Sequence, residues 1–183
     1  MGKKDKKDKT EKESSVDKMD VETLHAEKEK EKEKEKVEVS YEQRCLSVSV
    51  IAHPLASKKL TKKTYKTIKK AAKAKAVKRG VKEVVKGLRK GAKGVVIIAG
   101  DISPIDVITH IPVLCEENDV PYIYAPSKQD LGASSNTKRP TSVVMIVSPS
   151  SLKNKDAAAE YKDTYDELST EVKELNQKMI TVA

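Results

Sequence analysis

The amino-acid sequence predicts an α/β protein, folded as a three-layer α/β/α sandwich around a central mixed sheet. Two observations support this fold class. Between residues 54 and 147, runs rich in β-branched residues alternate with segments whose apolar residues recur at helical spacing. The 183 residues include no Trp or Phe, so the core must consist mainly of Val, Ile, Leu and Ala. This length allows one ordinary domain with extensions.

Composition divides the chain into three parts. Residues 1–40 are low in complexity, end in the alternating Glu-Lys run Glu27–Lys36 and contain few apolar residues, so we expect a charged tail that is disordered or transiently helical. Residues 41–149 carry the alternating pattern and are expected to form the α/β/α domain. Residues 150–183 predict a linker followed by a helix.

The first half of the domain predicts two helices. An irregular segment over residues 54–57 leads into a helix expected at Thr61–Val77. Gly80 separates it from a second helix expected at Val81–Lys90, which Gly91 or Gly94 ends. The apolar positions that define the buried faces are Leu60, Thr64, Ile68, Ala71 and Ala72 in the first helix and Val81, Val84, Val85 and Leu88 in the second.

The second half of the domain predicts three strands and two further helices. The strands are expected at Val95–Ala99, Pro121–Ala125 and Ser142–Val147. A helix is expected from Pro104 to about Asn118, because Pro suits a first helical turn, and Pro112 is expected to kink it. A shorter helix is expected at Lys128–Ser134. This alternation of strands and helices is the basis of the predicted sandwich.

The last helix is amphipathic. Its apolar residues alternate spacings of four and three, at Tyr161, Tyr165, Leu168, Val172, Leu175 and Met179. Such a stripe must be buried, either on the core of its own domain or against a partner helix. The sequence leaves both possibilities open.

Charge is distributed very unevenly. Residues 1–40 carry 12 basic and 13 acidic side chains, residues 41–150 carry 20 and 8, and residues 151–183 carry 5 and 7, which together give the net charge of +9. Within Lys58–Lys93, 16 basic residues accompany a single acid, Glu83. Solvated helix surfaces usually mix both signs. The excess therefore predicts a polyanionic partner, either a nucleic acid or an acidic or chromatin protein.

The sequence offers little for catalysis. His53, His110 and Cys115 are the reactive side chains of the domain, and the last two are expected to pack rather than form a dyad. Asp101 and Asp106 lack a third ligand at metal-binding spacing, and Asp101 is expected to end a strand. Phosphate-binding glycine motifs are absent. We expect no enzyme activity, no cofactor, no metal and no small-molecule substrate, with a catalytic His110 or Cys115 as the alternative.

Other composition features bear on the cellular setting. The sequence contains no apolar run of the roughly 18 residues that a membrane span needs. The charged start Met1–Lys12 is unlike a signal peptide. Cys45 and Cys115 form no metal or redox motif and are expected to be reduced. An intracellular, soluble protein without a membrane partner is expected.

The run Lys78–Lys86 (KRGVKEVVK) is the strongest local motif. Two cations precede a glycine that opens a helix, and the first turn of that helix carries Glu83. Free backbone N–H groups and the positive end of a helix suit phosphates, and a carboxylate can accept hydrogen bonds from base amino groups. Alternatively, Glu83 only complements the helix dipole.

This run resembles the signature of the kink-turn-binding family of ribosomal and small-ribonucleoprotein proteins. Three more blocks are similar to that family, in order and spacing: His110–Glu117 (HIPVLCEE), Val120–Tyr124 (VPYIY) and Ser127–Gly132 (SKQDLG). The resemblance covers about Pro54 to Val147 and neither end of the chain. Within the family it is closest to the eukaryotic H/ACA ribonucleoprotein branch.

The resemblance implies a non-catalytic RNA-binding core subunit of box H/ACA small nucleolar particles, in the nucleolus of the nucleus. Such particles use guide RNA to direct pseudouridine formation in ribosomal RNA and assist its processing, which contributes to ribosome biogenesis. The implied partners are the guide RNA and, through a small bridging subunit, a pseudouridine synthase. The implied RNA-binding residues are Lys78, Arg79, Gly80, Lys82, Glu83, Lys86, Val107, Lys128, Thr137 and Arg139.

Two positions depart from the kink-turn pattern. Lys82 stands where kink-turn readers have Asn, and Thr137 stands where they have an apolar residue. Because Lys only donates hydrogen bonds, whereas an amide also accepts them, base reading is exchanged for phosphate attraction. We expect weak sequence discrimination and strong salt dependence. The alternative function is a kink-turn reader of ribosomes, box C/D or spliceosomal particles.

Overall fold

The computed structural model describes residues 41–152 and 155–182. The predicted disordered tail over residues 1–40 lies outside the described residues. The chain divides into two units, Met1–Gln43 and Arg44–Ala183. The architecture below is that of the second unit.

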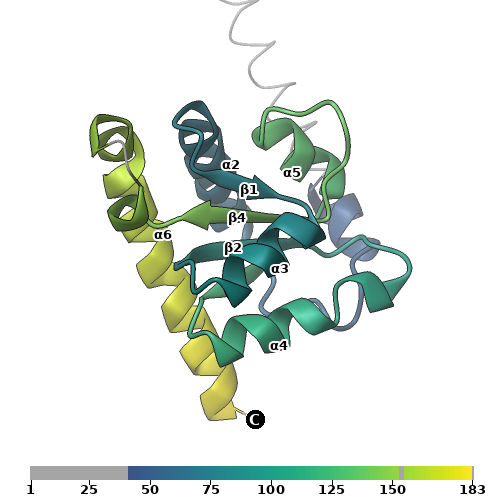
Figure 1. The fold of residues 1–183 in the computed structure, drawn as a ribbon. Coiled ribbons are helices and arrows are strands. Elements are labelled where there is room, and N and C mark those ends of the chain that lie inside the picture. Colours follow the sequence, from purple (N-terminus) through teal and green to yellow (C-terminus); the bar gives the residue numbers. More distant parts are fainter. Residues whose placement is uncertain (1–40, 153–154, 183) are drawn as a thin grey trace, which may run out of the picture. The chain divides into compact units, whose positions relative to one another are not determined.

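The second unit is built on a four-stranded mixed sheet (Figure 1). Its strands are β1 (Val77–Arg79), β2 (Gly94–Ala99), β3 (Tyr122–Ala125) and β4 (Val143–Val147), in the order β1-β4-β2-β3. Strands β2 and β3 are parallel, whereas β4 is antiparallel to both β1 and β2. All six residues of β2 are buried, as expected for a strand covered on both faces. The predicted mixed sheet is confirmed.

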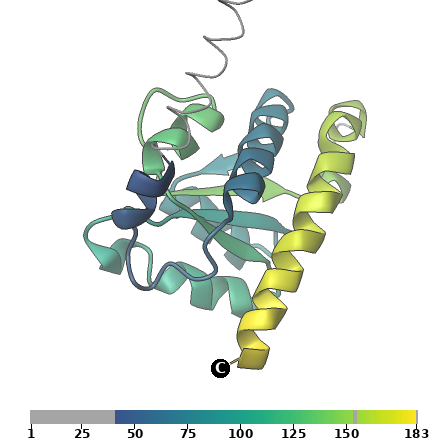
Figure 2. The ribbon, with the colours of Figure 1, turned by 180° about the vertical axis from the view of Figure 1, so that it is seen from behind.

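Helices cover both faces of this sheet (Figures 1 and 2). Helices α3 (Val81–Arg89) and α4 (His110–Glu117) lie together on one face. On the other face, α2 (Lys58–Lys73) packs between α5 (Lys128–Ser134) and α6 (Lys155–Val182). The predicted three-layer α/β/α sandwich is therefore confirmed. Among the described residues, no helix is long and apolar enough to cross a membrane.

Helix α2 differs from the predicted helix at its C-terminal end. Ser57 caps its start, since its Oγ accepts from the Leu60 N–H at 3.4 Å. The helix ends at Lys73, and Lys75 adopts a positive φ of 55°. Residues 77–79, partly predicted as helix, instead form the edge strand β1. This strand was missed because three residues, two of them cationic, are too short to show an alternating pattern.

The single kinked helix predicted from Pro104 to Asn118 is also wrong. The segment forms a short 3-10 turn, η1 (Ile105–Val107), followed by the separate helix α4. Pro112 lies in the first turn of α4, where backbone N–H groups have no intrahelical partner, so it does not bend the helix.

Helix α6 docks on the core of its own domain. Its predicted stripe is buried at Tyr161, Tyr165, Leu168 and Val172, and Met179 at its far end is 39% exposed. The Tyr161 hydroxyl donates to the Val147 carbonyl at 3.0 Å, which joins the helix to the end of β4. The possibility of docking on the core, left open by the sequence, is therefore the one observed.

Both edges of the sheet offer few backbone groups for pairing with a further strand. At the β3 edge, the Tyr124 N–H donates to the Pro54 carbonyl and the Ala56 N–H donates to the Tyr124 carbonyl, each at 2.9 Å. Leu55 thereby forms a parallel bridge with Tyr124. At the other edge, β1 is only three residues long and includes Lys78 and Arg79.

Candidate nucleic-acid interface

The sheet topology brings most of the implied RNA-binding residues to one end of the sheet. Strands β1, β2 and β3 all finish at the end where the antiparallel β4 begins, because Val143 pairs with Ile98 and Val144 with Arg79. The Gly80 N–H donates to the Val143 carbonyl at 2.8 Å. Segments that follow three strands and precede the fourth therefore meet there (Figure 1). We call this region the sheet end.

Gly80 makes the turn from β1 into α3. It is the N-cap residue of α3 with a φ of +80° and ψ of 158°, a conformation that residues with a side chain rarely adopt. A Cβ there would meet nothing within 4 Å, so the backbone conformation and not space requires glycine. The turn leaves the positive end of α3 at the sheet end.

Glu83 stabilises this turn. Its Oε2 accepts a hydrogen bond from the Arg79 N–H at 3.0 Å, so the carboxylate satisfies a backbone donor at the start of α3. This hydrogen bond is a local role, distinct from both base reading and the helix-dipole role that the sequence offered. A carboxylate has about four acceptor sites, so one hydrogen bond leaves capacity for a further donor.

The cations of the motif point in different directions. Lys82 and Lys86 are exposed on α3. The Lys78 side chain instead lies against α3, since a Cβ on Gly87 would come within 2.6 Å of the Lys78 Nζ. Successive strand residues face opposite sides, so Arg79 projects to the other face of β1, where its Nε is buried without a partner among the described residues. Lys78 is therefore set apart from the sheet end.

Lys128 and Asp101 join two neighbouring strand ends. The Lys128 N–H donates to Asp101 Oδ1 at 2.8 Å, and its Nζ donates to the Asp101 carbonyl at 3.3 Å. Asp101 follows β2 and Lys128 begins α5, so this contact fixes the Lys128 amine beside the sheet end. Asp101 thus has the strand-ending role expected of it. In the described part of the chain, no group of three His, Cys, Asp or Glu residues could hold a metal ion.

The loop between α5 and β4 is held against α5 by a close backbone approach. A Cβ on Gly132 would lie 2.3 Å from the Arg139 carbonyl oxygen, so only glycine fits there. The Thr137 N–H donates to the Gly132 carbonyl at 3.1 Å, and its Oγ1 lies 3.1 Å from both the Gly132 and Arg139 carbonyls. The Thr137 hydroxyl therefore serves the loop itself, whereas Arg139 is exposed. Val107, in η1, is 38% exposed.

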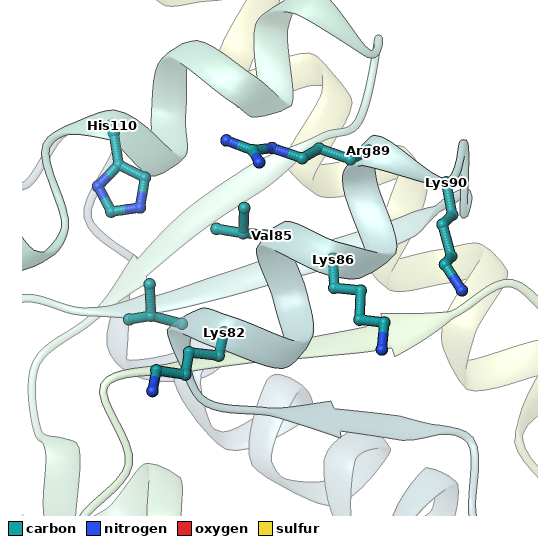
Figure 3. Close-up of a pocket in the computed structure, with 7 residues that line it drawn as sticks. Lys82, Val85, Lys86, Arg89, Lys90 and His110 are labelled. Carbon is teal, nitrogen blue, oxygen red and sulfur yellow. The ribbon is translucent and has the colours of Figure 1, made fainter.

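A basic pocket extends the cationic surface along α3 (Figure 3). It has a volume of about 450 Å³ and is lined by Val81, Lys82, Val85, Lys86, Arg89, Lys90 and His110. Figure 3 shows the Arg89 guanidinium extending toward the His110 ring. Arg89 and Lys90 were not predicted as site residues, although both continue the helical spacing from Lys82 and Lys86. His110 comes from α4 and gave no comparable signal.

The two reactive residues of α4 have different surroundings. Cys115 is fully buried in α4, and burial raises the pKa of its thiol to about 12. A thiol that stays protonated at neutral pH is a poor nucleophile. His110 is exposed and lines the basic pocket. The predicted packing role of Cys115 agrees with its burial, but His110 is not a packing residue.

Comparison with known proteins identifies the family. Residues 62–155 match the model of the ribosomal protein L7Ae/L30e/S12e/Gadd45 family. This match covers half of the chain, including all four strands. The chain belongs to the L7Ae/L30e/S12e/Gadd45 family.

Curated H/ACA ribonucleoprotein complex subunits share high sequence identity with this chain. The H/ACA ribonucleoprotein complex subunit NHP2 of Saccharomyces cerevisiae is 63% identical over 90 residues, 48% of this chain and 57% of that protein. The H/ACA ribonucleoprotein complex subunit 2 of Bos taurus is 48% identical over 142 residues, 78% of this chain and 87% of that protein. The match thus spans little more than half of the yeast protein and most of the bovine one.

A solved structure supports the fold of the L7Ae/L30e/S12e/Gadd45 family. The Giardia lamblia 15.5kD RNA binding protein is 32% identical, with a TM-score of 0.55. The similarity covers 66% of this chain and 99% of that chain.

Proposed function

We propose that this chain is a non-catalytic RNA-binding core subunit of a box H/ACA small nucleolar ribonucleoprotein particle. The observation that carries the proposal is the convergence of cations from three separate segments at the sheet end, in a protein similar to H/ACA complex subunits. Lys82 and Lys86 come from α3, Lys128 from α5 and Arg139 from the following loop. Convergent cations and a free helix start are typical of phosphate-backbone recognition.

Each residue then has a stated role. Lys82, Lys86 and Arg139 attract phosphates, and Lys128 supplies a cation whose position is set by Asp101. Gly80 provides the turn, and Glu83 holds it while retaining an acceptor for a base amino group. Val107 and Thr137 border the site. Arg79 contributes from the opposite face of β1, and Lys78 acts through its packing on α3.

The predominance of phosphate contacts bears on specificity. Lys82 cannot accept a hydrogen bond, and the hydroxyl of Thr137 bonds within its own loop. We infer weak discrimination among base sequences and a steep loss of affinity with salt. Recognition of the correct guide RNA then depends on the other subunits of the particle.

The particle supplies the remaining functions. A separate pseudouridine synthase, contacted through a small bridging subunit, performs uridine conversion in ribosomal RNA, and the particle assists rRNA processing in the nucleolus. We propose that residues 41–149 form the RNA-binding domain, with the tail and the last helix as extensions. No membrane, cofactor or small-molecule partner is proposed.

A kink-turn reader of ribosomal, box C/D or spliceosomal particles is the second candidate. The similarity to the Giardia 15.5kD RNA binding protein favours it. Lys82 argues against it, because a cation replaces the amide of kink-turn readers.

The deciding experiment is to sequence the RNA that copurifies with the tagged protein after washing above physiological salt. Enrichment of H/ACA guide RNAs together with a pseudouridine synthase is the expected result. Enrichment of box C/D or spliceosomal RNA would move the chain to the second candidate. Recovery of no specific RNA would overturn the RNA-binding function itself.

A further inference from the structure

Helix α2 carries a second cationic surface, on the face of the sheet opposite α3. Exposed lysines recur along it at spacings of three and four residues, at Lys59, Lys62, Lys66, Lys69 and Lys73. We call these five residues the α2 stripe. At 1.5 Å per residue the stripe is about 21 Å long. No acidic residue occurs within Lys58–Lys73.

Burial fixes the direction of the α2 stripe. The opposite side of the helix is buried at Leu60, Thr64, Ile68 and Ala71. Helix α2 therefore cannot rotate without exposing its core face, and the stripe is held toward solvent. A rigid row of like charges costs self-repulsion, which an anionic ligand would relieve.

Helix α6 neutralises one border of this surface in the described part of the chain. Lys63 lies on the α6 side of α2. Its Nζ is 2.5 Å from Glu171 Oε1 and 3.8 Å from Glu167 Oε2. The hydrogen bond and attraction from Glu171 raise the pKa of Lys63. Lys63 thus marks the boundary between a charge-paired flank and the α2 stripe.

The α2 stripe also begins close to the sheet end. The hydrogen bond between Ala56 and Tyr124 ties the segment before α2 to β3, and α2 packs against α5, which begins at Lys128. The far end of α2 lies by the opposite end of the sheet, where the Val147 N–H donates to the Ala76 carbonyl. The stripe therefore leads away from the sheet end along the back of the molecule.

We propose that the α2 stripe binds the phosphate backbone of an RNA stem, as a second surface separate from the sheet end. The proposal rests on the proposed function for the choice of RNA as ligand. Evenly spaced point charges suit a regular row of phosphates. A protein partner would require apolar contacts at its centre. Among the described residues, none of the exposed large apolar side chains belongs to α2.

The test compares stripe and flank lysines in the full-length protein. Fluorescence anisotropy with a labelled RNA stem-loop is measured at several salt concentrations for Lys66→Gln, Lys63→Gln and the triple variant Lys62→Gln, Lys66→Gln, Lys69→Gln. Removing one lysine–phosphate interaction should lower the slope of log affinity against log salt by about 0.9. We expect the triple variant to bind at least tenfold more weakly at low salt. Lys63 is already ion-paired in the wild-type protein, so the substitution Lys63→Gln should change RNA affinity less than twofold.

Two further variants keep the proposal distinct from the proposed function. The triple Lys→Arg variant at the same positions keeps the charge and should retain the wild-type slope. Lys82→Gln with Lys86→Gln tests the sheet end in parallel. If that variant loses affinity while the triple Gln variant matches wild type, the α2 stripe is not an RNA surface, although the proposed function stands. If the wild-type protein binds no stem-loop, both fail.

An acidic protein is the competing occupant. A polyglutamate peptide is titrated as a second probe under the same conditions. Loss of peptide binding by the triple Gln variant, with RNA binding unchanged, would overturn the RNA assignment. The RNA assignment is supported if the triple Gln variant loses RNA binding and if the wild-type protein binds the peptide more weakly than it binds an RNA of equal charge.

Discussion

Helices α3 and α6 lie on opposite faces of one sheet and use amphipathicity for different purposes. Helix α3 is nine residues long, buries only Val84, Gly87 and Leu88, and presents cations to solvent. Helix α6 is 28 residues long and buries an apolar stripe that includes two tyrosines, while two of its carboxylates, Glu167 and Glu171, pair with Lys63 of α2. The difference indicates that α6 mainly stabilises the fold, whereas α3 is available for a ligand.

The largest expected effect is on α6. Leu168→Ala removes a side chain that is 1% exposed and should lower the free energy of unfolding by about 2–5 kcal/mol. RNA affinity of the folded protein should not change. Urea denaturation and anisotropy measure the two quantities. Met179→Ala, at a partly exposed position of the same helix, is the matched control and should cost under about 1 kcal/mol. Equal losses in the two variants would show that α6 does not dock as described.

Substitutions on α3 should instead change RNA affinity and leave stability nearly unchanged. Lys82→Gln with Lys86→Gln removes two exposed cations and should weaken RNA binding on the order of tenfold. The thermal midpoint should move little, because neither side chain contributes to the core. Anisotropy and differential scanning calorimetry separate the two. A large fall in the midpoint with unchanged affinity would reverse the assignment of the two helices.

Alkaline pH should destabilise the α6 side of the molecule. Burial raises the pKa of Tyr161 from 10.0 to about 12. The neutral hydroxyl is favoured in the folded state, so its contribution is complete below pH 10 and is lost as pH rises to about 12. Tyr161→Phe removes this dependence and also the hydrogen bond to Val147, which is worth about 1 kcal/mol at neutral pH.

The measurement is the difference in unfolding free energy between Tyr161→Phe and wild type across this pH range. The difference should shrink above pH 10. A constant difference would mean that Tyr161 titrates equally in folded and unfolded chains.

Glu83→Ala should produce a smaller and mixed effect on α3. Loss of the acceptor for the Arg79 N–H should cost about 1 kcal/mol of stability. Nonspecific RNA affinity should be kept or raised, since a negative charge leaves the cationic surface, while preference for a stem-loop falls modestly. Anisotropy with stem-loop and unstructured RNA tests this. Equal weakening on both RNAs would contradict it.

The smallest effect is expected from restoring the kink-turn amide. Lys82→Asn should raise preference for a kink-turn RNA over a plain stem by a few-fold, because Asn both donates and accepts hydrogen bonds. Lys86→Asn removes the same charge one turn later and serves as the control. Unchanged preference in Lys82→Asn would mean that the loop containing Thr137 dominates recognition.

Continuous apolar runs and apolar stripes sustained over a long helix could be predicted from the sequence. The continuous run at Val95–Ala99 predicted β2, and the alternating spacing of four and three residues predicted the buried face of α6. Strand β1 was missed because tertiary pairing with β4, not local pattern, makes Val77–Arg79 a strand. Prediction of part of that strand as helix also concealed that Lys78 and Arg79 face opposite sides of the sheet.

The residues of the candidate RNA-binding site could be predicted from the sequence better than the contacts that those residues make. Resemblance supplied the residues, and the antiparallel placement of β4 explains why segments around four strands meet. Sequence alone did not reveal that Glu83 binds the Arg79 N–H or that the Thr137 hydroxyl bonds within its loop. The pocket between Arg89 and His110 was missed because it depends on packing of α3 against α4.

The restricted edges of the sheet have a consequence for solubility. An exposed strand edge can template pairing with another chain and lead to aggregation. Here the segment around Leu55 occupies backbone groups of β3, and the opposite edge is a short strand bearing Lys78 and Arg79. Intermolecular strand addition is thereby disfavoured at both sides. Two copies of the chain that meet would therefore have to associate through surfaces other than the edges of this sheet.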